Sequence, residues 1–558
     1  MGINKGDIVE IELVDLANGG DCVGRYDGLA VFVPGGVPGE LVKIRIIEKK
    51  KNYARGEILE VLKEALERVK AECPVFGICG GCHLQHISYE KQMEYKQKMV
   101  KDLLERIGKL GNIEVQPTFP ASYHFGYRNK AQFPLAKEST GQIISGFYQK
   151  GSHMVVPHDD CQIQHPLINR IMKKTLEMLN SYPELTVYDE RLHKGLLRHL
   201  VIRVGVCTNQ ALLVLVTNGR KIPQPEEIAR RIREEVTEIV GVLQNINTEK
   251  TNVVLGRELA VLSGQDYYID YIGKIKFAVS INSFFQVNTL QTKNLYDFVL
   301  EYAGLSGKET VFDAYCGIGS ISLYLAEEAE GVIGIEEVQA AIEDADKNAE
   351  LNEVENCRFI TARVEDKLPE LLAEGIKPDL IVFDPPRKGL DEKVIDTVIK
   401  VKPERIVYVS CNPATLARDL ALFREDYDIR KVQPVDMFPG TYHVETVVSL
   451  SHKNADSHIH INVEFGEGDG KIPVDDIARK AEDYRPSERV TYKKIQEYIE
   501  NKYNFKVHTA YIAEVKRGLG LPMYDAPNAV EELKHERKHP TPEKVEAIKE
   551  AFKYFGLI

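Results

Sequence analysis

The chain has 558 residues, 43% of them hydrophobic, and a formal net charge of −12. This length is too great for one hydrophobic core and predicts about three or four domains. The acidic balance excludes a general attraction to nucleic acid, so polyanion binding would depend on local basic patches. No run approaches the roughly 18 apolar residues of a membrane span, and the N-terminus lacks an apolar signal core, so we expect a cytoplasmic protein without membrane contact.

Residues 1–62 predict a small β-barrel. Short strands are separated by loops rich in glycine and proline, and they cover residues 7–14, 28–33, 40–48 and 54–61. This spacing is typical of an OB-like barrel, a fold that often carries nucleic acid. Basic residues and one aromatic ring gather on the later strands: Lys49, Lys50, Lys51, Tyr53 and Arg55. Such a run is usually a solvated face, and its alternative is a groove that follows a phosphate backbone beside a stacking ring.

Residues 63–276 combine a predicted helix over 89–107 with β-rich sequence, including strands over 200–206 and 211–216. Three cysteines lie close together and a fourth follows a long insertion: Cys73, Cys79, Cys82 and Cys161. Thiols clustered in a cytosolic chain are expected to be metal ligands because disulfides would be reduced. Zinc and an iron–sulfur cluster both accept four thiolates, so the spacing alone leaves the choice open.

From residue 277 to 452, strands and helices alternate at βαβ spacing, which predicts a mostly parallel sheet. An apolar strand leads through Asp313 into a glycine turn at Gly317, and the next strand ends on Glu336. An acidic residue at that position can bind the hydroxyls of a ribose. NAD is one candidate ligand, but the turn lacks a third glycine and no hydride-transfer partner is evident. S-adenosylmethionine also offers a ribose to Glu336, and its cationic groups suit Asp313.

Cys411 directly follows another apolar strand, at the edge of the sheet where ligands bind in such folds. A structural cysteine is an equally common interpretation of the position. A nucleophilic cysteine could add to C6 of a uracil, which activates C5 for methylation, and a base must then remove the C5 proton. Glu445 precedes an apolar strand and is the candidate base, although a surface carboxylate is the alternative. For the nearby His443 we expect a structural hydrogen bond.

Four motifs, in order along the chain, resemble those of the RNA uracil-C5 methyltransferases. They are Phe285-Gln286-Val287-Asn288, Phe383-Asp384-Pro385-Pro386-Arg387, Ser410-Cys411-Asn412-Pro413 and the segment from Phe438 to Glu445. The resemblance covers residues 1 to about 450 and implies that Cys411 is the nucleophile and Glu445 the base. It also implies S-adenosylmethionine contacts at Gln286, Tyr315, Glu336 and Asp384, and stacking of Phe284 on RNA. Tyr315 stands where phenylalanine is also common, a mild departure from the family pattern.

Residues 22–40 are similar to the TRAM domain, an OB-like RNA-binding barrel, which strengthens the interpretation of the basic cluster as an RNA contact. The family resemblance further implies a [4Fe-4S] cluster at the four cysteines. We therefore expect an α/β protein with a Rossmann-like S-adenosylmethionine-dependent methyltransferase domain at 277–452. The other expected parts are the barrel (1–62), a mixed central domain (63–276), a linker (453–483) and a small helical C-terminal domain of unassigned role (484–558).

The resemblance implies methylation of C5 of a specific uridine in 23S rRNA. We separately expect the protein to be a monomer. The ribosomal target is favoured because a TRAM domain together with four cysteines is the make-up of that branch of the family. A transfer-RNA uracil-C5 methyltransferase is one alternative. A non-catalytic RNA-binding or ribosome assembly protein is another, against which the intact Cys411 and Glu445 argue.

Overall fold

The computed structural model describes residues 3–111, 113–453, 492–503, 505–519 and 540–554. The chain divides into two compact units, residues 1–458 and 459–558. The predicted linker lies, from residue 454 onward, outside the described residues, and the finer domain boundaries inside the first unit remain predictions. Across the described ranges, no helix is long and apolar enough to cross a membrane.

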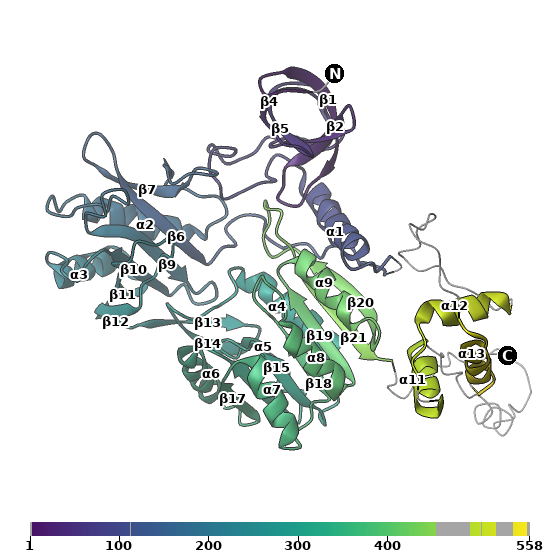
Figure 1. Cartoon of the computed structure of the whole chain (residues 1–558). Helices are drawn as coiled ribbons and strands as arrows, with labels where there is room; N and C mark the ends of the chain where they lie inside the picture. The colour runs from purple at the N-terminus through teal and green to yellow at the C-terminus, as the bar shows by residue number, and fades with distance from the viewer. Residues whose placement is uncertain (1–2, 112, 454–491, 504, 520–539, 555–558) are drawn as a thin grey trace, which may run out of the picture. The chain divides into compact units, whose positions relative to one another are not determined.

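The N-terminal strands close into a barrel in the order β1-β2-β3-β5-β4 (Figure 1). Their bounds are β1 Ile8–Leu16, β2 Cys22–Tyr26, β3 Leu29–Val33, β4 Leu41–Lys49 and β5 Tyr53–Lys63. This confirms the barrel expected from the sequence, except that β2 was not predicted. Gly24 interrupts the apolar pattern of β2, and a Cβ atom there would collide with the backbone oxygen of Glu12 on β1. The close approach of β1 and β2 therefore requires glycine at position 24. Because the same glycine interrupts the apolar pattern, the sequence did not predict β2.

The central part contains a seven-stranded sheet in the order β12-β11-β10-β9-β6-β7-β8. Its strands are β6 Lys130–Lys137, β7 Ile143–Tyr148, β8 Val155–Pro157, β9 Leu197–Val204, β10 Ala211–Thr217, β11 Ile239–Ile246 and β12 Glu258–Gly264. The helices of this region are α1 Tyr89–Arg106, α2 Pro166–Leu179 and α3 Pro225–Glu235. The predicted helix over 89–107 is confirmed as α1, and the two predicted strands are β9 and β10.

A second seven-stranded sheet has the order β17-β16-β15-β18-β19-β21-β20, in which β21 is antiparallel to β19 and the strands from β17 to β19 are parallel (Figure 1). The strands are β15 Thr310–Ala314, β16 Gly331–Glu336, β17 Cys357–Thr361, β18 Leu380–Phe383, β19 Arg405–Ser410, β20 Tyr427–Val435 and β21 Glu445–His452. The helices are α4 Thr289–Ala303, α5 Ser320–Leu325, α6 Gln339–Leu351, α7 Val364–Ala373, α8 Glu392–Val401 and α9 Pro413–Phe423. The α/β fold class is thus confirmed. The strand order reverses at β15, which creates a crevice at its carboxyl end.

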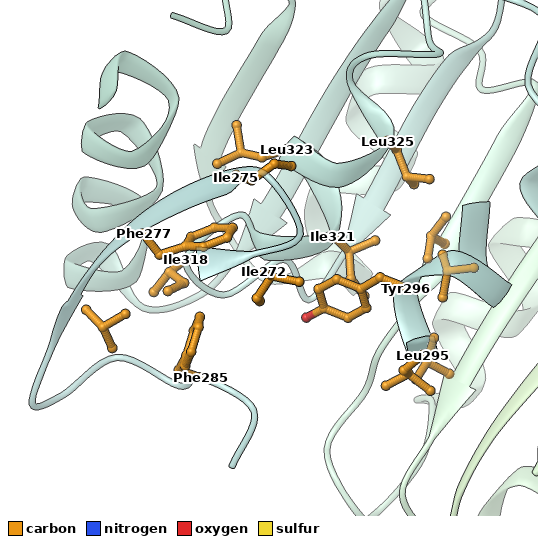
Figure 2. Close-up of a cluster of buried hydrophobic side chains, with 14 of the residues drawn as sticks. Ile272, Ile275, Phe277, Phe285, Leu295, Tyr296, Ile318, Ile321, Leu323 and Leu325 are labelled. Atoms are coloured by element: carbon orange, nitrogen blue, oxygen red, sulfur yellow. The ribbon is translucent and has the colours of Figure 1, made fainter. Parts of the chain in front are cut away.

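A buried apolar cluster joins this sheet to the hairpin of β13 Tyr267–Ile272 and β14 Ile275–Ser280 (Figure 2). The rings of Phe277 and Phe285 lie 5.8 Å apart between their centroids. The hydroxyls of Tyr296 on α4 and Ser320 on α5 are hydrogen-bonded at 2.8 Å. These contacts hold the segment that follows the hairpin against the sheet, and Gln286 belongs to that segment.

The second unit contains α11 Tyr492–Tyr503, α12 Thr509–Gly518 and α13 Pro542–Tyr554. Their buried apolar side chains form a separate core: Ile495, Ile499, Val507, Ile512, Val515, Ala547, Ile548, Ala551 and Phe552. The helix-rich C-terminal region expected from the sequence is confirmed for these residues.

Candidate active site

One edge of the second seven-stranded sheet carries the predicted functional residues. Asp384 and Cys411 each follow the last residue of a parallel strand, β18 and β19. Glu445 begins the antiparallel strand β21, and Ser410 pairs with Thr446, so Glu445 lies at the same edge as Cys411. A cavity of about 550 Å³ opens there. Its lining includes every residue predicted for catalysis and for the cofactor: Gln286, Asp313, Tyr315, Gly317, Glu336, Asp384, Cys411 and Glu445.

The glycine turn shapes one wall of this cavity. Gly317 has a positive φ of 54°, a conformation that favours glycine. Its N–H donates to one carboxylate oxygen of Glu336 at 3.3 Å, and the N–H of Val338 donates to the other at 3.0 Å. The carboxylate at the end of β16 is therefore held in place by the backbone, as binding of a ribose requires.

Tyr315 adopts the left-handed conformation, with a φ of 72°, although it is not a glycine. Such a backbone costs on the order of 1–3 kcal/mol and is found mainly at functional sites. The N–H groups of Tyr315 and Cys316 donate to the carbonyl of Ile335 at 2.9 and 3.1 Å, and these bonds maintain the turn. The strained turn places Tyr315 in the cavity lining.

Asp313 is fully buried at the end of β15 and accepts a hydrogen bond from the hydroxyl of Ser322 at 2.5 Å. Its Oδ1 atom has no hydrogen-bond partner among the described residues. Burial raises the pKa of this carboxyl to about 6. A buried acceptor without a partner beside a cavity is suited to a donor or a cation on a bound ligand.

Cys411 and Glu445, the predicted catalytic residues, lie in an environment that opposes negative charge. Burial, followed by the charges of Glu445 and Asp384, raises the pKa of the Cys411 thiol to about 12. Glu445 is 3% exposed, its Oε2 atom has no partner in the described part of the chain, and burial holds its pKa well above the usual range. Burial and the charge of Asp313 raise the pKa of Asp384 to about 7. The positive charge of Arg387 acts in the other direction and lowers the pKa of both Cys411 and Glu445. A cationic ligand in the cavity would favour the charged form of all these acids.

The loop that carries Cys411 is fixed by the residue after it. The side chain of Asn412 accepts a hydrogen bond from the N–H of Ala414 at 3.2 Å, which caps α9, and Pro413 occupies the first turn of that helix. The same side chain donates to the carbonyl of Arg387 at 3.0 Å. Asn412 therefore ties the nucleophile loop to the segment that carries Asp384.

The predicted RNA-binding residues fall into two groups. Phe284 lines the active-site cavity and is 67% exposed, so its ring is accessible to a base. The basic cluster on the barrel lines none of the cavities described here and lies where β4 leads into β5. Lys50 and Arg55 both pair with Glu48, at 2.9 and 3.8 Å, and the ring of Tyr53 packs against Phe32. RNA binding by Lys49, Lys50, Lys51, Tyr53 and Arg55 remains a prediction.

The cysteine residues predicted to bind a metal, Cys73, Cys79, Cys82 and Cys161, all line one further cavity of about 460 Å³. Burial raises the pKa of Cys82 to about 12 and that of Cys161 to about 11, and each neighbouring thiol adds to the effect. Among the described residues, no three His, Cys, Asp or Glu side chains are placed to hold a metal ion. The four thiols thus share a cavity without closing around a single ion. His443 lines the same cavity, and its ring packs against Tyr442 at 4.3 Å.

Arg128 lines both this cysteine cavity and the active-site cavity, and the sequence analysis missed it. It lies in a loop before β6, whereas the sequence analysis selected residues at the ends of β15, β16, β18 and β19. A lone arginine in a loop carries no pattern by which it could have been found.

Comparison with known proteins agrees with this geometry. Residues 88–453 match the tRNA (uracil-5-)-methyltransferase family, and residues 4–59 match the TRAM domain, which confirms that part of the sequence analysis. An uncharacterized RNA methyltransferase of Halalkalibacterium halodurans is 47% identical over 455 residues, which cover 81% of this chain and 98% of the relative. One from Clostridium tetani is 44% identical over 451 residues, covering 81% and 97%.

Among solved structures, the tRNA (uracil-54, C5)-methyltransferase of Pyrococcus abyssi, in complex with S-adenosyl-L-homocysteine, is similar with a TM-score of 0.63 and 27% identity. The match covers 79% of this chain and 100% of that one. The chain therefore belongs to the tRNA (uracil-5-)-methyltransferase family of RNA methyltransferases.

Proposed function

We propose that this protein transfers a methyl group from S-adenosylmethionine to C5 of a uridine in RNA. The observation that carries the proposal is the shared cavity in which Cys411 and Glu445 lie with the residues of the predicted cofactor site. A thiol and a carboxyl at one strand edge are the two groups that methylation of an unreactive ring carbon requires. The substrate uracil would have to leave its stack to reach them.

The reaction begins at Cys411, whose Sγ atom as thiolate bonds to C6 of uracil, while the electrons of the C5–C6 double bond move toward O4. Bound S-adenosylmethionine supplies an electrophilic methyl group on its sulfonium sulfur. C5 forms a bond to the methyl carbon as the methyl–sulfur bond breaks. The Glu445 carboxylate then removes the C5 proton, the C5–C6 double bond forms again, and Cys411 leaves as thiolate. The raised pKa of Glu445 makes its ionised form a strong base.

The cofactor would be held by carboxylates in the lining of the same cavity. Glu336, fixed by two backbone N–H groups, would accept hydrogen bonds from the ribose hydroxyls. The unpartnered Oδ1 of Asp313 and the carboxyl of Asp384 would face positive charge. Without a cation nearby, these two carboxyls resist ionisation, as their raised pKa values indicate. A positive charge on the ligand would stabilise their ionised forms, which supports a cationic methyl donor.

We also propose that the four cysteines hold a [4Fe-4S] cluster. Zinc and an iron–sulfur cluster both accept four thiolates, so the choice of the cluster rests on the family resemblance. The gathering of the four thiols at one cavity supports a shared ligand. Cys73, Cys79, Cys82 and Cys161 would be its ligands, and the cluster would stabilise the surrounding loops.

For the RNA target we favour 23S rRNA, on the combination of a TRAM domain with four cysteines in one cavity. A transfer RNA is the second candidate, because the structurally similar protein of Pyrococcus abyssi is a tRNA (uracil-54, C5)-methyltransferase. A non-catalytic role in ribosome assembly would leave the thiol of Cys411 and the buried carboxyl of Glu445, which line one cavity, without a purpose.

Incorporation of a labelled methyl group from S-adenosylmethionine into 23S rRNA and tRNA transcripts tests the function. We expect labelled 5-methyluridine in one of the two RNAs, and no label with Cys411→Ala. Cys207→Ala is the matched control, because Cys207 is an exposed cysteine outside both cavities. Full methylation by Cys411→Ala would refute the nucleophile, and label in tRNA alone would refute the ribosomal target.

A further inference from the structure

The cysteine cavity and the active-site cavity adjoin each other. Four residues line both of them: Arg128, Val287, Arg387 and Phe438. Val287 directly follows the cofactor-site residue Gln286, and Phe438 belongs to the segment that leads to Glu445. The shared wall therefore lies beside the proposed reacting groups Cys411 and Glu445.

The two cavities differ in charge. Among the described residues that line the cysteine cavity there is no Asp or Glu, while Arg128, Lys130 and Arg387 contribute three positive charges. The active-site cavity carries a majority of acids: Asp313, Glu336, Glu337, Glu365, Asp384, Asp391 and Glu445. A cationic methyl donor is suited to the acidic cavity. The shared wall itself carries two arginines, Arg128 and Arg387, and no acid, so it is suited to an anionic group although the protein as a whole is acidic.

The backbone of Arg128 is held firmly at this wall. Its N–H donates to the carbonyl of Ile163 and its own carbonyl accepts from the N–H of His165, both at 2.9 Å. The next residue, Asn129, donates from its side chain to the carbonyl of Gln286 at 2.9 Å and from its backbone to the carbonyl of Val287 at 2.8 Å. Arg128 is thus positioned against the same segment that carries the cofactor contact.

The guanidinium of Arg128, in contrast, makes no hydrogen bond or ion pair with the described part of the chain, and the residue is half-buried. Most described arginines with similar exposure have a carboxylate or carbonyl partner, as Arg233 and Arg405 do. A rigid backbone with an unpartnered guanidinium beside a cavity is the arrangement of an anion-binding residue. The planar fork of arginine matches the geometry of a phosphate.

We propose that Arg128 binds the RNA phosphodiester next to the target uridine at the shared wall, while the uracil itself enters the active-site cavity and reaches Cys411. The proposal rests on the proposed function and names the part of the RNA that this wall recognises. Arg387 lies at the same wall, where its charge also acts on Cys411 and Glu445. We assign Arg128 to the positioning of RNA because its unpartnered guanidinium lies at the shared wall.

The test is RNA binding by Arg128→Gln in the full-length protein, with a short fluorescein-labelled oligouridylate as probe and fluorescence anisotropy as readout. We expect the dissociation constant to rise by about tenfold and the slope of log K against log salt to fall by about one. Arg128→Lys should keep most of the salt slope but not the full affinity, because lysine lacks the bidentate fork. Arg358→Gln is the control for loss of one charge, since Arg358 is an exposed arginine on β17 that lines neither cavity.

The proposal is overturned if Arg128→Gln binds RNA with the affinity and salt slope of Arg358→Gln. It is also overturned if Arg128→Gln loses iron or binding of S-adenosyl-L-homocysteine in proportion to its loss of RNA binding. Arg128 would then stabilise the structure around the two cavities and would not contact RNA directly. The measurement needs no turnover. A protein that binds RNA through Arg128 but methylates no uridine would therefore contradict the proposed function and leave this inference standing.

Discussion

The ammonium of Lys96 lies 2.5 Å from a carboxylate oxygen of Asp436, and both side chains are buried. Asp436 also accepts hydrogen bonds from the hydroxyl of Tyr89 at 2.8 Å and from the N–H of Phe438 at 3.1 Å. Helix α1 thereby holds the start of the segment that ends at Glu445. The same segment is held at Gly440, whose carbonyl accepts from the N–H groups of His83 and Leu84, both at 2.9 Å.

Replacement of Lys96 by methionine is expected to lower the free energy of unfolding by about 3–5 kcal/mol, because the carboxylate of Asp436 would remain buried without its partner. Urea unfolding followed by circular dichroism measures the change. Lys98→Met is the matched control on the same helix: Lys98 pairs with Asp15 and Asp102 at the surface, where loss of the pairs costs about 1 kcal/mol or less. Equal effects of the two substitutions would contradict the importance of the buried pair.

The reactivity of Cys411 should reflect its raised pKa. With a pKa of about 12, the thiolate fraction rises about tenfold with each pH unit and does not level off below pH 10. Alkylation by iodoacetamide, followed at the Cys411 peptide by mass spectrometry, should show that rise in the ligand-free protein. A plateau below pH 8 would contradict it.

Asp384 contributes to this pKa through its negative charge. Asp384 ionises near pH 7, so its charge opposes the thiolate only above that pH. We therefore expect Asp384→Asn to be alkylated faster than the unmodified protein above pH 8, and at a similar rate below pH 6. Asp391→Asn is the control, because Asp391 lines the cavity but is not among the groups that shift Cys411, and asparagine can replace its cap of α8.

Substitution of Glu445 by glutamine should block the last step of the reaction. Without a base for the C5 proton, the methylated adduct between Cys411 and uracil cannot release its thiol, and turnover should fall by about 10²–10⁴-fold. A covalent protein–RNA band on a denaturing gel, dependent on S-adenosylmethionine, is the expected signal. The double variant with Cys411→Ala should give no band. Normal turnover by Glu445→Gln would exclude Glu445 as the base.

Sequence reasoning succeeded where local pattern determines structure. Apolar strands that end on Asp313, Glu336, Asp384 and Cys411 predicted one functional edge, because parallel strands align their carboxyl ends. The Lys96–Asp436 pair could not be predicted in the same way. The two residues are 340 positions apart, and a lysine in an amphipathic helix is normally expected to be exposed. The shared wall of the two cavities likewise depends on how distant segments meet, which no local pattern records.

The proposed cluster at the four cysteines predicts that the protein contains iron. Protein purified without oxygen should contain about four iron atoms per chain and absorb visible light, as iron–sulfur clusters do. Cys161→Ser should lose most of the iron, because Cys161 is one of the four thiols in the cavity, whereas Cys207→Ser should retain it. One equivalent of zinc without iron would show that the cavity closes around a single ion instead.

Removal of residues 459–558 should leave RNA methylation intact. The residues that line the active-site and cysteine cavities all lie in the first unit, while the helices α11, α12 and α13 have a core of their own. A chain ending at residue 458 is therefore expected to bind S-adenosyl-L-homocysteine within about twofold of the full-length value, as domains with separate cores usually behave independently. Isothermal titration and methyl incorporation into the RNA that the full-length protein modifies provide the two readouts. If cofactor binding persists but methylation is lost, the second unit takes part in RNA recognition; if both are lost, the two units do not fold independently.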